Sequence, residues 1–325
     1  MQRAIISKKI NNLLLRNNTS RIINYFSTAN GKTEINNNFL VTKKINNLLL
    51  RNNASRIVNY FSTANGKTEI NNNFLVTETV GNICILKMAK APVNTFDIDM
   101  MNLFQNKILE LEEDPHIQGL VLTSAYDGIF SAGLDLKYLA NPNPADFKMF
   151  WSTFESMWKT LYLTPLATVA AINGSSPALG AVMALSTDYR IFVSNPKFKF
   201  GLNETSLGMI PPLWLQEMTA RTIGVREAEL HLGHSSMVSP EDALRIGYVD
   251  ELSTSDALLD AATKKCSNFT KIPIGSRSDY KMYQRKAIGD MAGQASVDMM
   301  AENILGDEFQ RTITKIMDGL KKKKK

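Results

Sequence analysis

The sequence of 325 residues predicts a layered α/β domain. Short apolar segments typical of strands alternate along the chain with longer segments whose apolar residues recur at helical spacing. In addition, two of the strand-like segments run directly into loops of small residues that precede a helical segment. Loops that leave the ends of strands are where layered α/β proteins bind their ligands. The composition, 44% hydrophobic and 21% charged, is that of a globular protein and permits this prediction.

The predicted elements begin after about Glu78. GNICILKMA indicates a strand, and FDIDMMNLFQNKILELEED carries Met100, Leu103, Phe104 and Ile108 at helical spacing. GLVLTSA indicates a second, buried strand, which is followed by a loop and a long helical stretch. ATVAAI and YRIFVSN are the next two strands. The predicted strands are therefore 81–89, 119–125, 167–172 and 189–195, and the predicted helices are 96–114 and 147–162.

The first 77 residues contain two copies of one segment. Residues 8–42 recur as 43–77 with two differences, Thr19 against Ala54 and Ile23 against Val58. Two copies followed by unrelated sequence indicate a duplication and not a solenoid, which needs about three or more stacked repeats. Each copy is rich in Arg and Asn, poor in acids and scattered with apolar residues, as mitochondrial transit peptides are. The alternative is an Asn-rich disordered arm without an address.

The net charge of +6 is unevenly distributed along the chain. Residues 1–77 hold 11 basic and 2 acidic side chains, so the remainder holds 37 − 11 = 26 basic and 31 − 2 = 29 acidic ones, a net charge of −3. A nucleic-acid-binding domain is expected to keep a basic face, so the charge argues against one. Cys84 and Cys266 have no ligand-like or disulfide-like spacing. No apolar stretch approaches the roughly 20 residues of a membrane span.

Two small-residue loops are candidate binding elements. They are GIFSAGLDL, Gly128 to Leu136, and NGSSPALGAVMAL, Asn173 to Leu185. Small side chains let a ligand approach the backbone, and the first N–H groups of a helix have no partner of their own. Two such groups that converge would bind a developing oxyanion. Periodicity alone favours ordinary glycine-containing turns.

A single carboxylate marks the segment FGLNETSLGMIPPLWL. Glu204 is the only charged residue from Phe200 to Leu215. Taken by itself, a lone acid in an apolar loop is more often an ion-paired or capping residue than a catalyst. The adjacent Asn203 is compatible with an ordinary turn.

Four motifs together resemble one family. FSAGLDL, AINGSSPALGAV, DYRIF and FGLNETSLGMIPPLWL are similar to the motifs of the crotonase (enoyl-CoA hydratase/isomerase) superfamily, especially its mitochondrial Δ3,Δ2-enoyl-CoA isomerases. The resemblance runs from about Val80 to the C-terminus. It implies the ClpP/crotonase-like α/β fold of repeated ββα units with a C-terminal helical trimerisation region. The expected organisation is a leader at 1–77, a core with the active site at 78–255, and C-terminal helices with a lysine-rich tail at 256–325.

The resemblance also assigns a site. It makes Glu204 the single catalytic base and places an oxyanion hole at the backbone N–H groups of Ala132 and Leu179. Many members of the family have glycine where this chain has Leu179, but any residue other than proline keeps the amide donor. Burial among apolar neighbours should raise the pKa of Glu204 and strengthen it as a base. The expected substrate-binding residues are Ala132, Gly133, Leu134, Asp135, Leu136, Leu179 and Asn203.

The number of carboxylates separates two activities within the family. Hydratases use a second glutamate, and in this chain that position is Val182. Adding water requires a pair of acid/base groups, whereas moving a double bond requires one. The resemblance therefore implies an isomerase that converts 3-enoyl-CoA to trans-2-enoyl-CoA in the β-oxidation of unsaturated fatty acids. The alternatives are an enoyl-CoA hydratase and a non-catalytic homologue that binds acyl-CoA or RNA.

Other residues have structural interpretations beside functional ones. Asp135 is a candidate N-cap, and Asn94 is expected in a turn near the coenzyme A path. The three histidines lack a metal-ligand pattern. Trp151, Trp158 and Tyr162 are spaced as the inner face of a helix, either over the acyl pocket or in the core. The resemblance implies a homotrimer of the mitochondrial matrix with no metal and no cofactor beyond the coenzyme A of its substrate. The charge distribution and the short apolar stretches predict no association with nucleic acid and no integral association with membranes.

Overall fold

The computed structural model describes residues 74–322. Most of the predicted leader, including the copy at 8–42, lies outside the described residues. Its last residues belong to the fold, because strand β1, Leu75–Val80, pairs antiparallel with β2, Ile83–Met88. Strand β1 therefore begins three residues before residue 78, where the core was predicted to start. Most side chains of β1 are exposed, so the strand lacks the buried apolar pattern from which the other strands were predicted.

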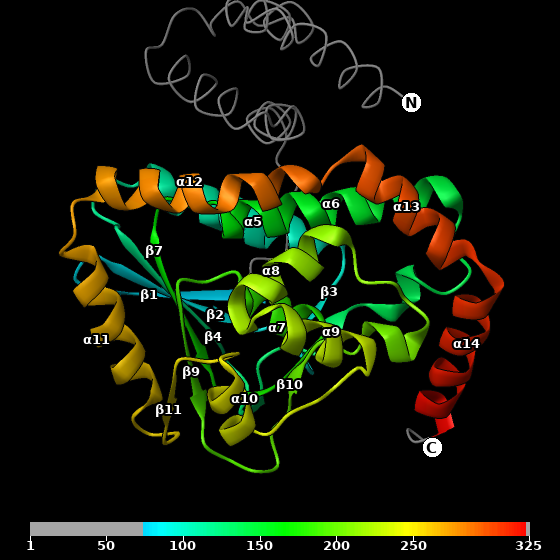
Figure 1. Cartoon of the computed structure of the whole chain (residues 1–325). Coiled ribbons are helices and arrows are strands. Elements are labelled where there is room, and N and C mark those ends of the chain that lie inside the picture. Colours follow the sequence, from blue (N-terminus) through cyan, green and yellow to red (C-terminus); the bar gives the residue numbers. More distant parts are fainter. Residues whose placement is uncertain (1–73, 323–325) are drawn as a thin grey trace, which may run out of the picture. The chain divides into compact units, whose positions relative to one another are not determined.

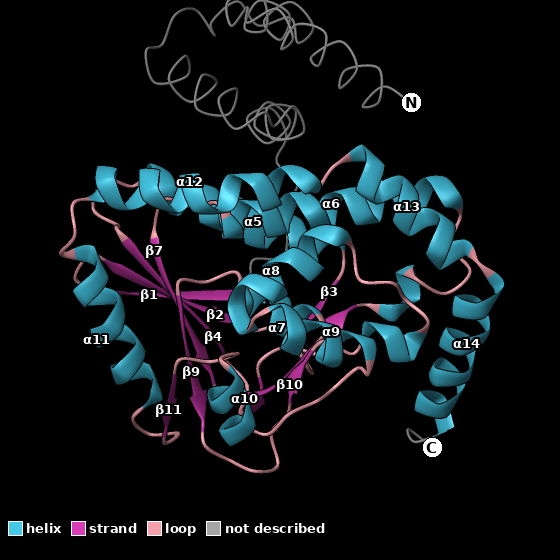
Figure 2. Cartoon of the chain, viewed as in Figure 1, coloured by secondary structure: helices cyan, strands magenta, loops and turns pink. Residues whose placement is uncertain are grey.

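A six-stranded sheet forms the centre of the fold (Figure 2). Its strand order is β1-β2-β4-β7-β9-β11, and every neighbouring pair after β1 and β2 is parallel. The four predicted strands are confirmed, 167–172 with the predicted bounds and the other three with shorter ones. The remaining four strands are β4, Gly119–Ser124; β7, Ala167–Ile172; β9, Tyr189–Val193; and β11, Glu251–Ser253.

Both faces of this sheet are covered by helices (Figure 1). Side chains alternate along a strand: in β4, Val121 packs with helix α11, Leu258–Thr270, while Leu120 and Leu122 pack in the core on the other face. Helix α11 lies close to the sheet because Gly119 has no side chain. A Cβ atom at Gly119 would lie 2.5 Å from Cys266 Sγ.

Two long helices cover the opposite face. Helix α5, Ile98–Glu113, begins at the N-cap Asp97, whose carboxylate accepts a hydrogen bond from the Met100 amide at 2.9 Å. Helix α6, Pro144–Tyr162, packs against α5 and begins three residues before the predicted stretch. Both helices bury the apolar stripe that predicted them.

Several short elements bring the predicted site segments together. Strand β8, Gly174–Pro177, lies between β5, Gly128–Ile129, and β10, Phe200–Gly201. Glycine is required at this contact, because a Cβ atom on Gly174 would lie 2.0 Å from the backbone of Gly128. The remaining short elements are β3, Thr95–Phe96, which pairs with β6, Gly133–Leu134, and the helices η2, Leu136–Tyr138; α7, Leu179–Leu185; and η3, Glu204–Leu207.

Helices make up most of the C-terminal part. The last two, α13, Gln294–Leu305, and α14, Asp307–Lys322, bury apolar residues such as Val297, Ile304 and Phe309 in the main core. These two C-terminal helices therefore pack against the core. The other helices are α8, Leu213–Ile223; α9, Val225–Gly233; α10, Pro240–Ile246; and α12, Ile274–Met291.

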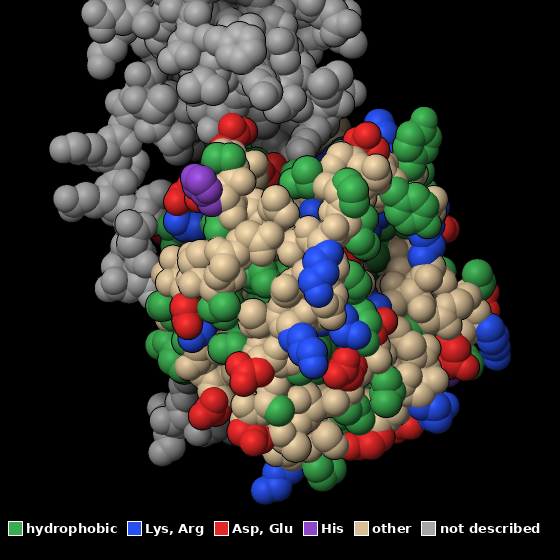
Figure 3. Space-filling view, turned by 90° about the vertical axis from the view of Figure 1, so that its left-hand side faces the viewer, with side chains coloured by type: hydrophobic (Ala, Val, Ile, Leu, Met, Phe, Trp, Pro, Cys, Tyr) green, Lys and Arg blue, Asp and Glu red, His purple; other side chains and the backbone are tan. Residues whose placement is uncertain are grey.

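The face of the molecule on which α11 lies carries charges of both signs. Figure 3 shows basic and acidic side chains interspersed on this face. Such a face lacks the single-sign field that a nucleic-acid surface requires. Within residues 74–322, no helix combines the length and apolarity that a membrane crossing demands.

Candidate functional site

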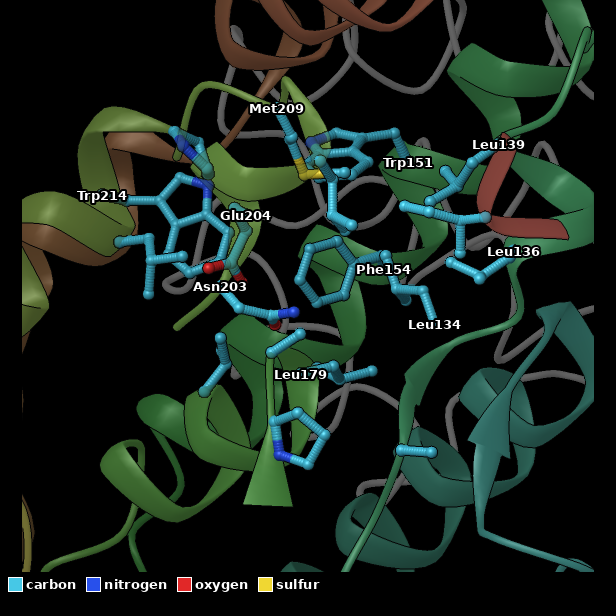
Figure 4. A pocket seen from close by; sticks show the side chains of 18 residues that line it. Leu134, Leu136, Leu139, Trp151, Phe154, Leu179, Asn203, Glu204, Met209 and Trp214 are labelled. Atoms are coloured by element: carbon cyan, nitrogen blue, oxygen red, sulfur yellow. The ribbon is translucent and has the colours of Figure 1, made fainter. Parts of the chain in front are cut away.

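A mostly apolar cavity of about 230 Å³ lies where the short elements meet (Figure 4). Glu204 is the only ionisable side chain among the residues that line it, and the other polar groups are the amide of Asn203 and the indole N–H groups of two tryptophans. The lining comprises Ala132, Leu134, Leu136, Leu139, Trp151, Phe154, Pro177, Ala178, Leu179, Val182, Asn203, Glu204, Leu207, Met209, Pro212, Trp214, Leu215 and Ile316.

The backbone of η3 is held by contacts of the residues that follow Glu204. The Thr205 hydroxyl donates to the carbonyl oxygen of Leu232 in α9 at 2.6 Å, and the Ser206 amide donates to Ser235 Oγ at 2.6 Å. Gly208 ends η3 with a φ of 76°, a left-handed conformation that glycine adopts without strain. Glu204 is thus placed by a short turn that hydrogen bonds of the following residues hold in position.

The electrostatic surroundings of Glu204 favour its neutral form. Its side chain is 6% exposed, and burial raises its pKa to about 7. Oε2 has no hydrogen-bond partner among the described residues, and within the same range Glu204 forms no ion pair. Figure 4 shows its carboxylate beside Trp214 and Asn203. The ion-paired interpretation therefore fails, and burial leaves a carboxyl group at the cavity whose pKa lies near neutral pH.

Leu179 begins helix α7 at the cavity. The first intrahelical bond of α7 runs from the Val182 amide to the Ala178 carbonyl oxygen, so the Leu179 N–H has no acceptor within the helix. Gly133, from the other small-residue loop, lies against it: a Cβ atom there would be 3.7 Å from Leu179 N. The two small-residue loops therefore meet at the cavity.

Ala132 requires a correction. It lines the cavity as expected, but its amide donates to the carbonyl oxygen of Val93 at 2.9 Å. The chain before β6 continues the pairing with the chain before β3, and this pairing occupies the amide that was assigned to the oxyanion hole. Neighbouring amides are also engaged: that of Gly133 donates to Ser131 Oγ and that of Asp135 to the Phe96 carbonyl oxygen.

The other predicted substrate-binding residues divide into two groups. Leu134, Leu136 and Asn203 line the cavity, and the Asn203 Oδ1 is buried without a hydrogen-bond partner in the described chain. Gly133 and Asp135 do not line it. Asp135 instead accepts a hydrogen bond from the Lys137 amide at 3.1 Å, which confirms the N-cap role.

Asn94 holds the loop that precedes β6. Its side-chain amide donates to Ser124 Oγ at 2.7 Å and to the Phe130 carbonyl oxygen at 3.0 Å, and its own carbonyl oxygen accepts from Ser131 Oγ at 2.8 Å. Asn94 is fully buried at a φ of 52°. These contacts confirm the turn role, and Asn94 does not line the cavity.

Val182 occupies the wall of the cavity on α7 and is 2% exposed. It presents a hydrocarbon side chain where a hydratase of the family would place its second glutamate. No other carboxylate lines this cavity. The described site can therefore remove and return a proton, but it offers no second group to hold and split a water molecule.

Aromatic side chains form one wall of the cavity. Trp151 and Phe154 come from α6 and Trp214 from α8. The prediction that the inner face of this helix borders the pocket is confirmed for Trp151, whereas Trp158 and Tyr162 pack in the core behind it. The sequence analysis missed Trp214 and Ile316 as lining residues. Helical spacing indicates which side of a helix is buried, but it does not say against which cavity.

Metal ligands are absent from the described site. Within residues 74–322, no three His, Cys, Asp or Glu side chains are grouped so as to hold a metal ion. His231 lies in α9, with Nε2 3.4 Å from the Glu227 carboxylate and its ring edge-on to Tyr248.

Comparisons with known proteins agree with this geometry. The profile of the enoyl-CoA hydratase/isomerase family matches residues 78–321. Mitochondrial enoyl-CoA delta isomerase 1 of Mus musculus is 37% identical over 235 residues, which are 71% of this chain and 81% of that protein. The Homo sapiens protein of the same name is 34% identical over 235 residues, 71% of this chain and 78% of the relative.

A solved structure shares the fold. The crystal structure of human mitochondrial delta3-delta2-enoyl-CoA isomerase superposes with a TM-score of 0.75 at 32% sequence identity. The similarity covers 78% of this chain and 100% of that one. The crotonase-like fold expected from the sequence is thereby confirmed.

Proposed function

We infer that this chain, which belongs to the enoyl-CoA hydratase/isomerase family, is an enoyl-CoA isomerase that moves the double bond of a 3-enoyl-CoA to position 2. The single observation that carries this function is the lone carboxylate of Glu204 in an otherwise apolar cavity. A 1,3-shift of a proton needs one group that first accepts and then donates. Glu204 supplies that group. Hydration would require a second acid/base group, and Val182 has none.

The proposed reaction has two proton transfers. With the acyl chain in the cavity, the Glu204 carboxylate removes a proton from C2, and the C2–H electron pair enters the conjugated dienolate. The neutral carboxylic acid then returns a proton at C4, while the electrons shift to form the C2–C3 double bond. Burial raises the pKa of Glu204 to about 7, which suits a group that must both accept and donate near neutral pH.

The dienolate places negative charge on the thioester oxygen, and backbone amides stabilise it. The Leu179 N–H at the start of α7 is the first proposed donor, because the helix leaves it without an acceptor. For the second donor we propose Leu134 in place of Ala132. Leu134 lines the cavity, whereas the amides of its neighbours Gly133 and Asp135 donate elsewhere.

The buried Oδ1 of Asn203 supports a role in positioning. It lies at the cavity next to the base and has no partner in the described chain. A buried polar atom without a partner is costly unless a ligand supplies one. We propose that Asn203 accepts a hydrogen bond from the bound acyl-CoA.

The setting of the enzyme is proposed from its relatives. The curated relatives are named as mitochondrial, which supports a mitochondrial location, and we propose the matrix and a role in the β-oxidation of unsaturated fatty acids. We also propose a homotrimer. As written, the reaction consumes no cofactor, because Glu204 supplies the acid/base group and coenzyme A is part of the substrate.

A direct assay tests the function. The full chain is given 3-hexenoyl-CoA, the absorbance of the conjugated thioester is followed, and the products are separated by chromatography. The proposal expects 2-hexenoyl-CoA without accumulation of 3-hydroxyhexanoyl-CoA. Formation of the hydroxy product from 2-hexenoyl-CoA would assign the chain to the hydratases, and binding of the thioester without conversion would indicate a non-catalytic acyl-CoA-binding protein.

A further inference from the structure

A second buried carboxylate, Glu155, lies behind the aromatic wall of the cavity. It is 4% exposed and does not line the cavity itself. Its Oε1 accepts three side-chain hydrogen bonds: from Trp151 Nε1 at 3.1 Å, from Trp214 Nε1 at 3.0 Å and from Ser296 Oγ at 2.5 Å. The donors belong to α6, α8 and α13, so one oxygen joins three helices that are far apart in the sequence.

Two of these donors are the indoles of the cavity wall. Figure 4 shows Trp214 beside Glu204, whereas Trp151 lies toward Met209 and Leu139. Between them, Phe154 contacts both rings, with centroid distances of 5.0 Å to Trp151 and 5.8 Å to Trp214. Because Glu155 fixes both indole N–H groups, it determines how the two rings face the cavity.

A buried carboxylate at this place is not needed for the stability of the core. A carboxylate in the core loses its hydration, and well-packed apolar residues in place of buried charges are often as stable or more stable. Burial raises the pKa of Glu155, against the opposing effect of hydrogen bonds from Ser296, Trp214 and Trp151. A buried carboxylate accepts directed hydrogen bonds, which give geometric specificity that an apolar side chain cannot provide.

We propose that Glu155 is a positioning residue that sets the acyl-chain selectivity of the cavity by fixing the indoles of Trp151 and Trp214. This inference rests on the proposed function, because it assigns the cavity to the acyl chain. A short acyl chain contacts the wall near Glu204, where Trp214 lies. A longer chain extends further along the wall and depends on both rings.

The first test compares substrates of two lengths. For Glu155→Ala, the KM for 3-decenoyl-CoA should rise about tenfold relative to the KM for 3-hexenoyl-CoA, as expected if buried hydrogen bonds that orient the wall are lost. The kcat for 3-hexenoyl-CoA should stay within about threefold of the wild type, because Glu204 is untouched. Ser296→Ala, which removes one of the three donors, should shift the KM ratio in the same direction by less.

Two further variants separate positioning from general stability. Glu155→Gln keeps an acceptor oxygen at this place and should restore the wild-type KM ratio. The matched control is Gln105, a buried side chain of α5 whose Nε2 donates to Ser156 Oγ and Thr160 Oγ1 on α6, away from the cavity. Gln105→Ala should lower the free energy of unfolding and leave the KM ratio unchanged.

A second readout does not depend on catalysis. The three tryptophans of the chain, Trp151, Trp158 and Trp214, all belong to this cluster, and Trp158 stacks on Trp214 with a centroid distance of 3.9 Å. Intrinsic fluorescence therefore reports on the wall, and its emission should shift in Glu155→Ala but not in Gln105→Ala. Calorimetric binding of hexanoyl-CoA and decanoyl-CoA should show the same loss for the longer chain.

The outcomes distinguish the two proposals. If the wild type binds both saturated thioesters and Glu155→Ala weakens only decanoyl-CoA, the role of Glu155 stands even where isomerase activity is absent. If Glu155→Ala and Ser296→Ala leave the length ratio and the emission unchanged, the positioning role is rejected. Should Glu155→Ala fail to fold, Ser296→Ala decides the question by the same two measurements.

Discussion

Glu204 and Glu155 are two buried carboxylates on either side of one aromatic wall, with opposite surroundings. Their side chains are 6% and 4% exposed, and burial raises the pKa of both. Oε2 of each lacks a partner in the described chain, but Oε1 of Glu155 receives three side-chain hydrogen bonds behind the wall, whereas Glu204 lines the cavity and receives none from a described side chain. Burial alone therefore does not identify a catalytic acid. A carboxylate that is held by directed side-chain donors behind the wall serves the structure, whereas one that lines a cavity without such donors is available for chemistry.

The largest expected difference between the two residues is in kcat. Glu204→Gln should lower kcat by roughly 10³ to 10⁴, because a positioned acid/base group contributes about that much and the amide cannot accept the proton. Glu155→Gln should keep kcat for 3-hexenoyl-CoA within about threefold. Steady-state kinetics with 3-hexenoyl-CoA measures both. Equal losses in the two variants would remove the distinction between the carboxylates.

The same substitution at Glu204 should stabilise the fold above neutral pH. Its pKa is raised from 4.5 to about 7, so the folded state binds the proton more tightly than the unfolded chain does. The stabilisation of the folded state by the protonated Glu204 is fully present below pH 4.5 and is lost as the pH rises to about 7. Above that pH, Glu204→Gln should be more stable than the wild type by about 3 kcal/mol.

Urea unfolding at pH 5 and pH 8 tests this stability difference. The gain of Glu204→Gln over the wild type should grow from the lower to the higher pH. A gain that is independent of pH would show that the carboxylate of Glu204 does not titrate in this range.

Catalysis should depend on pH in the opposite sense. Glu204 must be ionised to accept the first proton, so kcat/KM should rise with pH and level off above about 7. At pH 5 it should be about 100-fold below its plateau, as two pH units below a pKa require. The profile is measured with the wild type and with Glu155→Gln, which should share one midpoint. A midpoint near 4.5 would mean that the base is hydrated and not buried.

The smallest effect is expected from the turn that holds the base. Thr205→Val removes the hydroxyl that bonds to Leu232 and Ser235, and should lower the free energy of unfolding by about 1 kcal/mol. The kcat should fall several-fold while the pH midpoint stays where it is, because the burial of Glu204 is unchanged. Thermal unfolding and a pH profile measure the two effects. A shifted midpoint of the pH profile would show that this turn determines the pKa of Glu204 as well as its position.

Local signals in the sequence explain which predictions succeeded. Glu204 stands out because it is the only charge in an apolar segment of sixteen residues, Phe200 to Leu215. Val182 follows from the motif around it, and both lie in the cavity as expected. The buried strands β4 and β7 are continuous apolar runs, which fixes them within one or two residues.

The assignment of the Ala132 amide, and the features that the sequence analysis missed, depended on partners that are distant in the sequence. The Ala132 amide is occupied because Val93, 39 residues earlier, pairs with it, and no local pattern reports that register. Ile316 reaches the cavity from the last helix, and Trp214 lies beside the base through packing that only the fold defines. Most side chains of strand β1 are exposed, so its sequence lacks the apolar pattern from which a strand is predicted.

The central claim is that Glu204 alone carries the proton from C2 to C4, and the fate of a label tests it most directly. The wild type is mixed in excess with 3-hexenoyl-CoA deuterated at C2, and the product of a single turnover is analysed by mass spectrometry and NMR. A single buried carboxylate predicts that part of the deuterium appears at C4 of the product. A product whose C4 has gained only solvent hydrogen, with all transferred deuterium lost, would contradict the one-base account and require a second acid.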